Sequence, residues 1–87
     1  MVRLHDIVAI FHSIHKVMKA EKELKRKRFT ILLIPVPRQL TSDCGLAIRY
    51  AESDRQEIEA FLNEQGLPPE ELYLKTEEGF DLLETGE

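Results

Sequence analysis

D-I-V-A-I-F, residues 6–11, is the segment from which the expected architecture follows. This nearly continuous run of aliphatic, β-branched and aromatic residues is typical of a strand that lies inside a sheet. It stops at His12-Ser13, and Ser13 is a favourable N-cap for a helix over residues 14–27. The apolar face of that helix, which would pack on the sheet, consists of Ile14, Val17, Met18 and Leu24.

Three further strands are predicted over residues 29–34, 46–50 and 72–74. The first of these is almost continuously apolar, which predicts a buried strand. The second alternates apolar residues with others, which predicts a strand exposed on one face.

A second helix is predicted between the last two strands. Ser53 and Gln56 have the spacing of a capping box at its beginning, and Gly66 marks its end. Its apolar stripe consists of Ile58, Phe61 and Leu62.

The order of elements is β-α-β-β-α-β, which predicts an α+β fold. We expect the ferredoxin-like sandwich, an antiparallel sheet with two helices on one face. A chain of 87 residues has room for one such domain. The domain would span residues 1–75, and an acidic C-terminal tail would span residues 76–87. The tail is expected to form a short helix or to stay mobile, and its apolar residues are Phe80, Leu82 and Leu83.

The cysteine content and the apolar stretches indicate the compartment. The chain contains one cysteine and cannot form an internal disulfide, which excludes the disulfide-rich secreted scaffolds. Its longest apolar stretch, residues 29–36, is much shorter than the roughly 20 residues that span a bilayer. The N-terminus lacks the pattern of a signal peptide. We therefore expect a cytoplasmic protein with no membrane segment.

The charge pattern disfavours a nucleic-acid partner. The net charge is −4, and the basic residues gather in the segment 22–28 at the end of the first predicted helix. Positive charge there complements the helix dipole. No aromatic platform of the RNA-binding type accompanies the basic segment, so we expect a solvated helix end.

The connection P-V-P-R-Q-L-T-S-D-C-G, residues 35–45, is the candidate functional loop. It is longer than an ordinary hairpin turn, and long loops in compact domains tend to be functional. Two prolines restrict its backbone where the preceding strand ends. Its Thr-Ser-Asp segment can bond to nearby N–H groups, and its last glycine allows a positive φ. The loop residues expected to support the cysteine are Arg38, Ser42, Asp43 and Gly45.

Cys44 is the candidate reactive residue. A thiolate is the nucleophile, so reactivity depends on positive charge that lowers the thiol pKa from about 8.5. The connection rules bring Ser13, His15 and the start of the first helix to the same end of the sheet as the loop. The helix start, Arg38 and a protonated His15 would lower the thiol pKa, whereas Asp43 would raise it. The alternative is a small buried hydrophobic residue, as free cysteines often are.

Two stretches, F-H-S-I-H-K-V-M-K-A-E-K-E-L-K and I-P-V-P-R-Q-L-T-S-D-C-G-L-A-I, resemble a family of small bacterial and archaeal proteins described as selenium/sulfur carrier-like. In that family an S-T-H-x-A-L-x-A-E-K-x-L-K helix precedes a P-x-P-R-x-x-S-S-D-C-G loop. The resemblance covers about residues 8–75 and implies a thiol carrier. The sequence departs from the family at Ile14 and Thr41, and at Lys27-Arg28, where a glycine commonly ends the helix. The matching residues are Ser13, His15, Ala20, Glu21, Lys22, Leu24, Lys25, Pro35, Pro37, Arg38, Ser42, Asp43, Cys44 and Gly45.

We therefore expect a carrier or binding protein rather than an enzyme, without a cofactor. Cys44 would hold sulfur or selenium as a persulfide or selenide adduct, stabilised by Arg38 and by the helix start from Ser13 to His15. Donor and acceptor proteins would exchange the load through thiolate attack. The rival hypothesis is a small-anion-sensing or assembly module that binds at Arg38 without thiol chemistry. The exposed edge strands of such a domain allow a homodimer.

Two further sequence patterns each allow more than one interpretation. Glu21 lies inside the apolar stripe of the first helix, so either its stem covers the edge of the stripe or it forms an ion pair with Arg38 that positions the loop. A metal site is not expected, because no C-x-x-C or H-x-x-x-H pair is present. The residues that could otherwise meet as ligands are His12, His15, Asp43 and Cys44.

Overall fold

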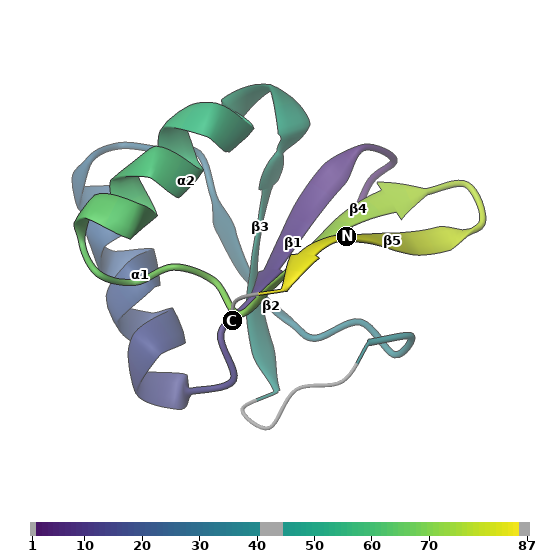
Figure 1. The fold of residues 1–87 in the computed structure, drawn as a ribbon, viewed down its shortest axis with the longest axis horizontal. Helices are drawn as coiled ribbons and strands as arrows, with labels where there is room; N and C mark the ends of the chain where they lie inside the picture. Colours follow the sequence, from purple (N-terminus) through teal and green to yellow (C-terminus); the bar gives the residue numbers. More distant parts are fainter. Residues whose placement is uncertain (1, 41–44, 86–87) are drawn as a thin grey trace.

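The computed structural model describes residues 2–40 and 45–85, which form an α+β fold. The helices are α1 (Ile14–Arg26) and α2 (Arg55–Glu64), and a short 3-10 helix, η1 (Glu52–Asp54), precedes α2. The strands are β1 (Asp6–Ile10), β2 (Leu32–Pro35), β3 (Leu46–Ala51), β4 (Glu71–Thr76) and β5 (Gly79–Thr85). They form one five-stranded antiparallel sheet in the order β2-β3-β1-β4-β5 (Figure 1). In the described part of the chain, neither helix has the length and apolar character needed to cross a bilayer.

β1 lies at the centre of the sheet, as its apolar sequence predicts. It pairs with β3 on one side and with β4 on the other. The side chains from Ile7 to Ile10 are fully buried, so both faces of the strand are covered. A strand buried on both faces has no position for a polar side chain, which explains the unbroken apolar run.

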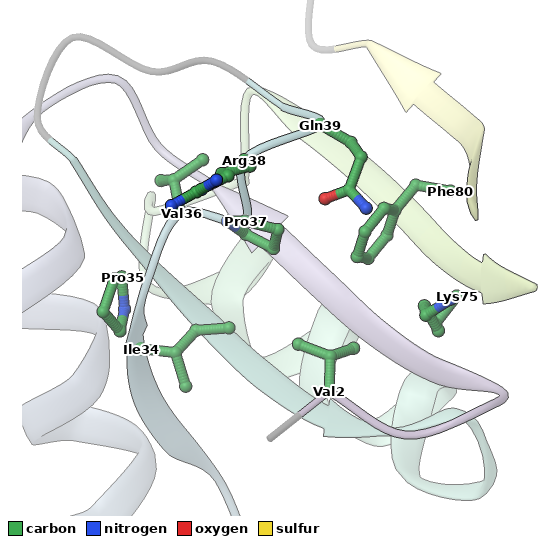
Figure 2. A pocket seen from close by; sticks show the side chains of 9 residues that line it. All are labelled: Val2, Ile34, Pro35, Val36, Pro37, Arg38, Gln39, Lys75 and Phe80. Carbon is green, nitrogen blue, oxygen red and sulfur yellow. The ribbon is translucent and has the colours of Figure 1, made fainter.

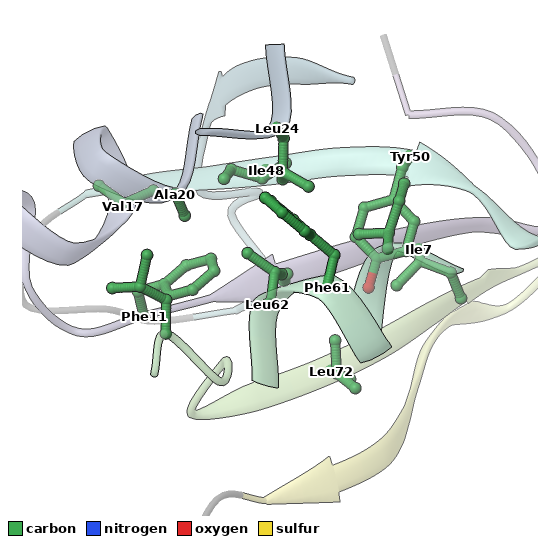
Figure 3. Close-up of a cluster of buried hydrophobic side chains, with 13 residues drawn as sticks. Ile7, Phe11, Val17, Ala20, Leu24, Ile48, Tyr50, Phe61, Leu62 and Leu72 are labelled. Atoms are coloured by element: carbon green, nitrogen blue, oxygen red, sulfur yellow. The ribbon is translucent and has the colours of Figure 1, made fainter. Parts of the chain in front are cut away.

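Both helices cover one face of the sheet, also as predicted. α1 and α2 turn their buried side chains toward those of β1 and β3 and form the larger core cluster (Figure 3). The side chains of α1 in this cluster are those of Val17, Ala20 and Leu24. The prediction that Ile14 and Met18 also pack on the sheet is wrong, because they are 44% and 43% exposed. The buried face of α1 is centred between Ala20 and Leu24, where the small alanine allows the helix to approach the sheet closely.

The second face of the sheet carries a smaller apolar cluster and no helix. Val8 and Ile10 of β1, Ile34 of β2 and Ala47 of β3 form its buried part. The flanking apolar side chains are supplied by the N-terminal segment, the loop after β2, β4 and β5. These are Val2, Val36, Leu40, Tyr73 and Phe80.

β2 differs from its prediction in position and in burial. It begins at Leu32 rather than Phe29, because the N–H of Phe29 donates to the carbonyl of Leu24 at 3.0 Å and so closes α1. β2 is an edge strand in which only Ile34 is buried, and Leu32 is 44% exposed.

The beginning of α2 also differs from its prediction. Ser53 lies inside η1, and α2 begins at Arg55 after Asp54, whose side chain makes no capping hydrogen bond. The predicted capping box of Ser53 and Gln56 is therefore wrong. The end of the helix is confirmed, since Gly66 follows its C-cap with φ of +71°.

β5 is the element that sequence reasoning missed. Residues Gly79–Thr85 form a strand that pairs with β4, so neither alternative expected for the tail, a short helix through Phe80, Leu82 and Leu83 or a mobile segment, holds for these residues. Phe80 lies opposite Lys75, and Leu82 lies opposite Tyr73. The chain therefore adds a fifth strand to the predicted sheet of four.

Candidate functional site

One end of the sheet gathers the segments to which the candidate residues belong. Ile10, the last residue of β1, lies opposite Ala47, and Pro35, the last residue of β2, lies opposite Leu46 at the beginning of β3. The segment after β1 and the loop between β2 and β3 therefore leave the sheet at the same end. This confirms the relation that the connection rules predicted.

The beginning of α1 lies at this end and is capped as predicted. Ser13 has an extended backbone, and its Oγ accepts a hydrogen bond from the N–H of Lys16 at 3.3 Å. No acidic residue lies in the first turn. Within the described residues, no acceptor pairs with the N–H groups of Ile14 and His15. Toward the described residues, the helix start therefore has two N–H groups without an acceptor, and its positive potential can be used by an anion.

Gly45 fixes the far end of the loop. It has φ of +75°, and its carbonyl accepts a hydrogen bond from the N–H of Val36 at 3.0 Å. The predicted positive φ is confirmed, and the bond holds the two ends of the intervening segment together. Ser42, Asp43 and Cys44 lie outside the described residues.

Arg38 lies on the face of the sheet that has no helix. It lines a pocket of about 420 Å³ together with residues of β2, β4, β5 and the N-terminal segment (Figure 2). Its side chain is exposed, and no acceptor from the described residues pairs with it. α1 packs on the opposite face. Arg38 and the helix start thus belong to one end of the sheet but to different faces.

Of the two alternatives for Glu21, the ion pair with Arg38 is not formed. The carboxylate of Glu21 instead lies 2.9 Å from Nζ of Lys25, one turn further along α1. The side chain of Glu21 is 18% exposed, and a lysine at this spacing supplies the partner that a half-buried carboxylate needs.

His15 and His12 have different surroundings. His15 is exposed in the first turn of α1. His12 follows β1 with φ of +54°, and its Nε2 lies 2.6 Å from Oε2 of Glu71. Across residues 2–40 and 45–85, no three metal-ligating side chains gather in a cluster.

A hydrogen-bonded chain of His12, Glu71 and Tyr73 is the polar feature that sequence reasoning missed. The hydroxyl of Tyr73 donates to Oε1 of Glu71 at 2.6 Å. The hydrogen bonds from Tyr73, first, and then His12 lower the pKa of Glu71, and its carboxylate raises the pKa of Tyr73 to about 12. Glu71 and Tyr73 alternate on one strand, but their contact with His12 depends on the pairing of β1 with β4, which local sequence does not reveal.

A model of the family described as "Putative Se/S carrier protein-like" matches residues 6–74. The match includes β1 to β3, both helices, the loop between β2 and β3 and most of β4. No curated protein and no solved structure matches the chain.

Proposed function

The chain belongs to the "Putative Se/S carrier protein-like" family, and from this premise we propose that it carries sulfur or selenium on the thiol of Cys44. Cys44 is the only cysteine in the chain, so it alone can hold a persulfide or selenide adduct. The protein would act as a carrier rather than an enzyme. Its partners would be a donor protein and an acceptor protein.

The observation that carries this proposal is the pair of N–H groups at the start of α1 that have no acceptor among residues 2–40 and 45–85. Gly45, the chain neighbour of Cys44, lies at the end of the sheet where α1 begins. α1 packs over β3, the strand that follows Gly45. A helix start with unpaired donors and no acidic side chain favours a thiolate or a persulfide anion over the neutral form.

Arg38 has no part in sulfur transfer under this proposal. It lines a pocket on the face opposite α1, whereas Gly45 continues into Leu46, which packs against the helix-covered face. The stabilising potential is therefore assigned to the backbone of Ile14 and His15. Ser42 and Asp43 stay candidates for orienting the thiol through backbone hydrogen bonds.

The load would move by two thiol exchange reactions that balance without an oxidant. In loading, the Cys44 thiolate attacks the outer sulfur of a donor persulfide, a new S–S bond forms, and the donor leaves as a thiolate. In unloading, an acceptor thiolate attacks the outer sulfur on Cys44, and Cys44 leaves as a thiolate. A thiolate that is stabilised both attacks and leaves at neutral pH, and the reducing cytoplasm would keep it available.

We assign the first four strands and the two helices to the ferredoxin-like arrangement, with β5 as an addition beside β4. The order of elements and the position of β3 between β1 and β2 support this assignment. β2 and β5 are the two edges of the sheet, and pairing through either would give a homodimer.

Intact mass and alkylation rate test the carrier proposal together. Protein isolated without reductant should contain a fraction heavier by about 32 or 80 Da, the mass of one sulfur or selenium atom on a reactive thiol. The Cys44→Ser variant should lack this fraction. Iodoacetamide should modify the native protein near neutral pH at least about tenfold faster than the urea-unfolded protein, because the unfolded thiol has its ordinary pKa.

The Arg38→Gln variant separates the two possible sources of positive potential. Its alkylation rate should equal that of the wild type, because the proposal assigns the effect to the start of α1. A native rate no higher than the unfolded rate would rule out an activated thiol. A lower alkylation rate in Arg38→Gln would mean that the guanidinium of Arg38 stabilises the thiolate.

A further inference from the structure

The pocket beside Arg38 combines apolar walls with positively charged side chains. Its volume of about 420 Å³ falls in the range of small-molecule sites. Figure 2 shows Ile34 and Pro35 on one side of the hollow, Phe80 on the other and Val2 below them. The pocket lies on the sheet face whose buried side chains from the central strands β1 and β3 are Val8, Ile10 and Ala47.

The charged groups at the pocket are both cations. Arg38 and Lys75 line it, and no acidic residue does so among those described. Nζ of Lys75 lies 5.4 Å from the centre of the Phe80 ring and donates one hydrogen bond, to the carbonyl of Thr76 at 2.7 Å. An ammonium group has three donors, so two remain for a ligand. Arg38 offers a guanidinium with no acceptor in the described part of the chain.

We propose that this pocket binds a small amphipathic anion. An aromatic or branched aliphatic body would lie against Ile34, Val36 and Phe80, and a carboxylate or sulfonate would accept hydrogen bonds from Arg38 and Lys75. A bare inorganic anion would leave the apolar walls in contact with water, and an uncharged ligand would leave both cations without a partner. The chain has a net charge of −4, so this pair of cations is not part of a general basic surface.

This inference goes beyond the proposed sulfur transfer and shares no residue with it. The pocket contains none of the groups assigned to the thiol chemistry, because its residues lie on the face opposite α1. Each proposal can therefore fail while the other holds.

Binding of anilinonaphthalene sulfonate, followed by its fluorescence, tests the proposal. The wild type should bind one equivalent, and Arg38→Gln and Lys75→Gln should each weaken binding about tenfold, the usual worth of one charge-assisted hydrogen bond. Phenylbutyrate should displace the probe, whereas phenylbutanol, which has the same body without the charge, should not. Cys44→Ser should bind the probe as the wild type does.

Two controls make the result decisive. Arg28→Gln removes a cation of the same type from an exposed position outside the pocket, and it should not change the affinity. Urea midpoints equal to that of the wild type should show that the pocket variants are folded. Equal displacement by the acid and the alcohol, or equal weakening by Arg28→Gln and Arg38→Gln, would overturn the proposal. Unchanged binding in an Arg38→Gln, Lys75→Gln double variant would also overturn it.

Discussion

Lys16 is the residue at which the stability of α1 and the reactivity of Cys44 can be changed in opposite directions. It is exposed at the third position of α1, and its N–H is already bonded to Ser13. Lys16→Glu would place a carboxylate at the positive end of the helix and should stabilise the fold by about 0.5 kcal/mol. The same charge would raise the thiol pKa and should slow alkylation of Cys44 about 3- to 10-fold near neutral pH.

Lys22→Glu is the matched control for this prediction. It makes the same change of charge at an exposed position of α1 two turns from its start. It should leave the alkylation rate within about twofold of the wild type, since the dipole effect is confined to the terminal turn. Equal slowing by both variants would mean that net charge, and not the helix start, controls the thiol.

Tyr73 and Glu71 should titrate as a pair. The neighbouring carboxylate raises the pKa of Tyr73 to about 12, so the hydrogen bond adds stability that is present below the tyrosine's ordinary pKa of about 10 and is lost as pH rises through about 12. Ultraviolet titration should show a phenolate step near 12 that Tyr73→Phe removes. In Glu71→Gln this step should move down toward about 10. The chain also contains Tyr50, so the pairing would be contradicted if Tyr73→Phe removed a step near 10 instead of the step near 12.

The ionisation of Glu71 at acidic pH provides a second test of the hydrogen bond between Tyr73 and Glu71. The hydrogen bonds from Tyr73 and His12 lower its pKa from the ordinary 4.5. A lowered pKa contributes stability that is present above 4.5 and is lost as pH falls through the lowered value. The wild type should therefore be more stable than Glu71→Gln at neutral pH, and the difference in unfolding free energy should shrink below the ordinary pKa. A difference independent of pH would exclude this linkage.

At the level of elements, the two helices end in the same motif with different residues. In α2 the N–H of Leu67 donates to the carbonyl of Leu62 at 2.9 Å, around Gly66 with φ of +71°. In α1 the N–H of Phe29 donates to the carbonyl of Leu24 at 3.0 Å, around Arg28 with φ of +67°. Both are Schellman motifs, but only α2 has the glycine that the left-handed position favours.

Arg28→Gly should therefore stabilise the protein. The left-handed conformation costs a non-glycine residue about 1–2 kcal/mol, and glycine avoids this cost. Part of the resulting gain in stability is offset, because glycine has greater conformational freedom in the unfolded chain. We expect a net gain of about 0.5–1 kcal/mol, measured as a higher urea midpoint.

Gly66→Ala is the reverse of this change and its control. A Cβ at Gly66 would meet no atom within 4 Å, so any loss reflects the backbone conformation alone. It should lower stability by about 1 kcal/mol. If Arg28→Gly and Gly66→Ala shifted the urea midpoint in the same direction, the cost of the left-handed conformation at Arg28 would not determine the effect of Arg28→Gly on stability.

The elements that the sequence predicted well are those with local signals. The cap at Ser13 depends on residues within one turn, and the central place of β1 follows from an apolar run that needs no knowledge of its neighbours. The capping box at Ser53 fails because Ser53 itself lies inside η1, and α2 begins one residue later than expected, at Arg55. The late start of β2 comes from the bond that closes α1 through Phe29.

The elements that were missed depend on contacts between distant residues. β5 mixes its apolar residues, Phe80, Leu82 and Leu83, with acidic ones in no alternating pattern, and it forms because β4 offers an unpaired edge. The contact of His12 with Glu71 arises only when β1 and β4 pair. The place of Arg38 depends on how the loop folds over the second face of the sheet. None of these contacts leaves a periodic pattern in the sequence.

For the whole molecule, coverage of the second sheet face depends on β5 and on the loop after β2. Phe80 contributes to the apolar cluster of that face, whereas Leu82, two residues further along the same strand, is 53% exposed. Phe80→Ala should lower the unfolding free energy by about 1–2 kcal/mol, less than for a fully buried phenylalanine. Leu82→Ala should lower it by less than about 0.5 kcal/mol.

Urea unfolding of the two variants measures this difference. Both substitutions shorten a side chain on β5, so the propensity of the strand changes similarly in each. Equal losses would mean that β5 acts only through its backbone pairing with β4, and that the second face contributes little to stability.

The hydrogen bond from the N–H of Val36 to the carbonyl of Gly45 affects how much the loop between β2 and β3 can vary in length and sequence among related proteins. It fixes the two ends of an insert, residues 37–44, against the sheet edge. Doubling the length of a loop adds only about 0.6 kcal/mol to the entropic cost of closing it. Evolution can therefore lengthen, shorten or rewrite this insert while the scaffold beneath it stays the same, and partner choice can change without a new fold.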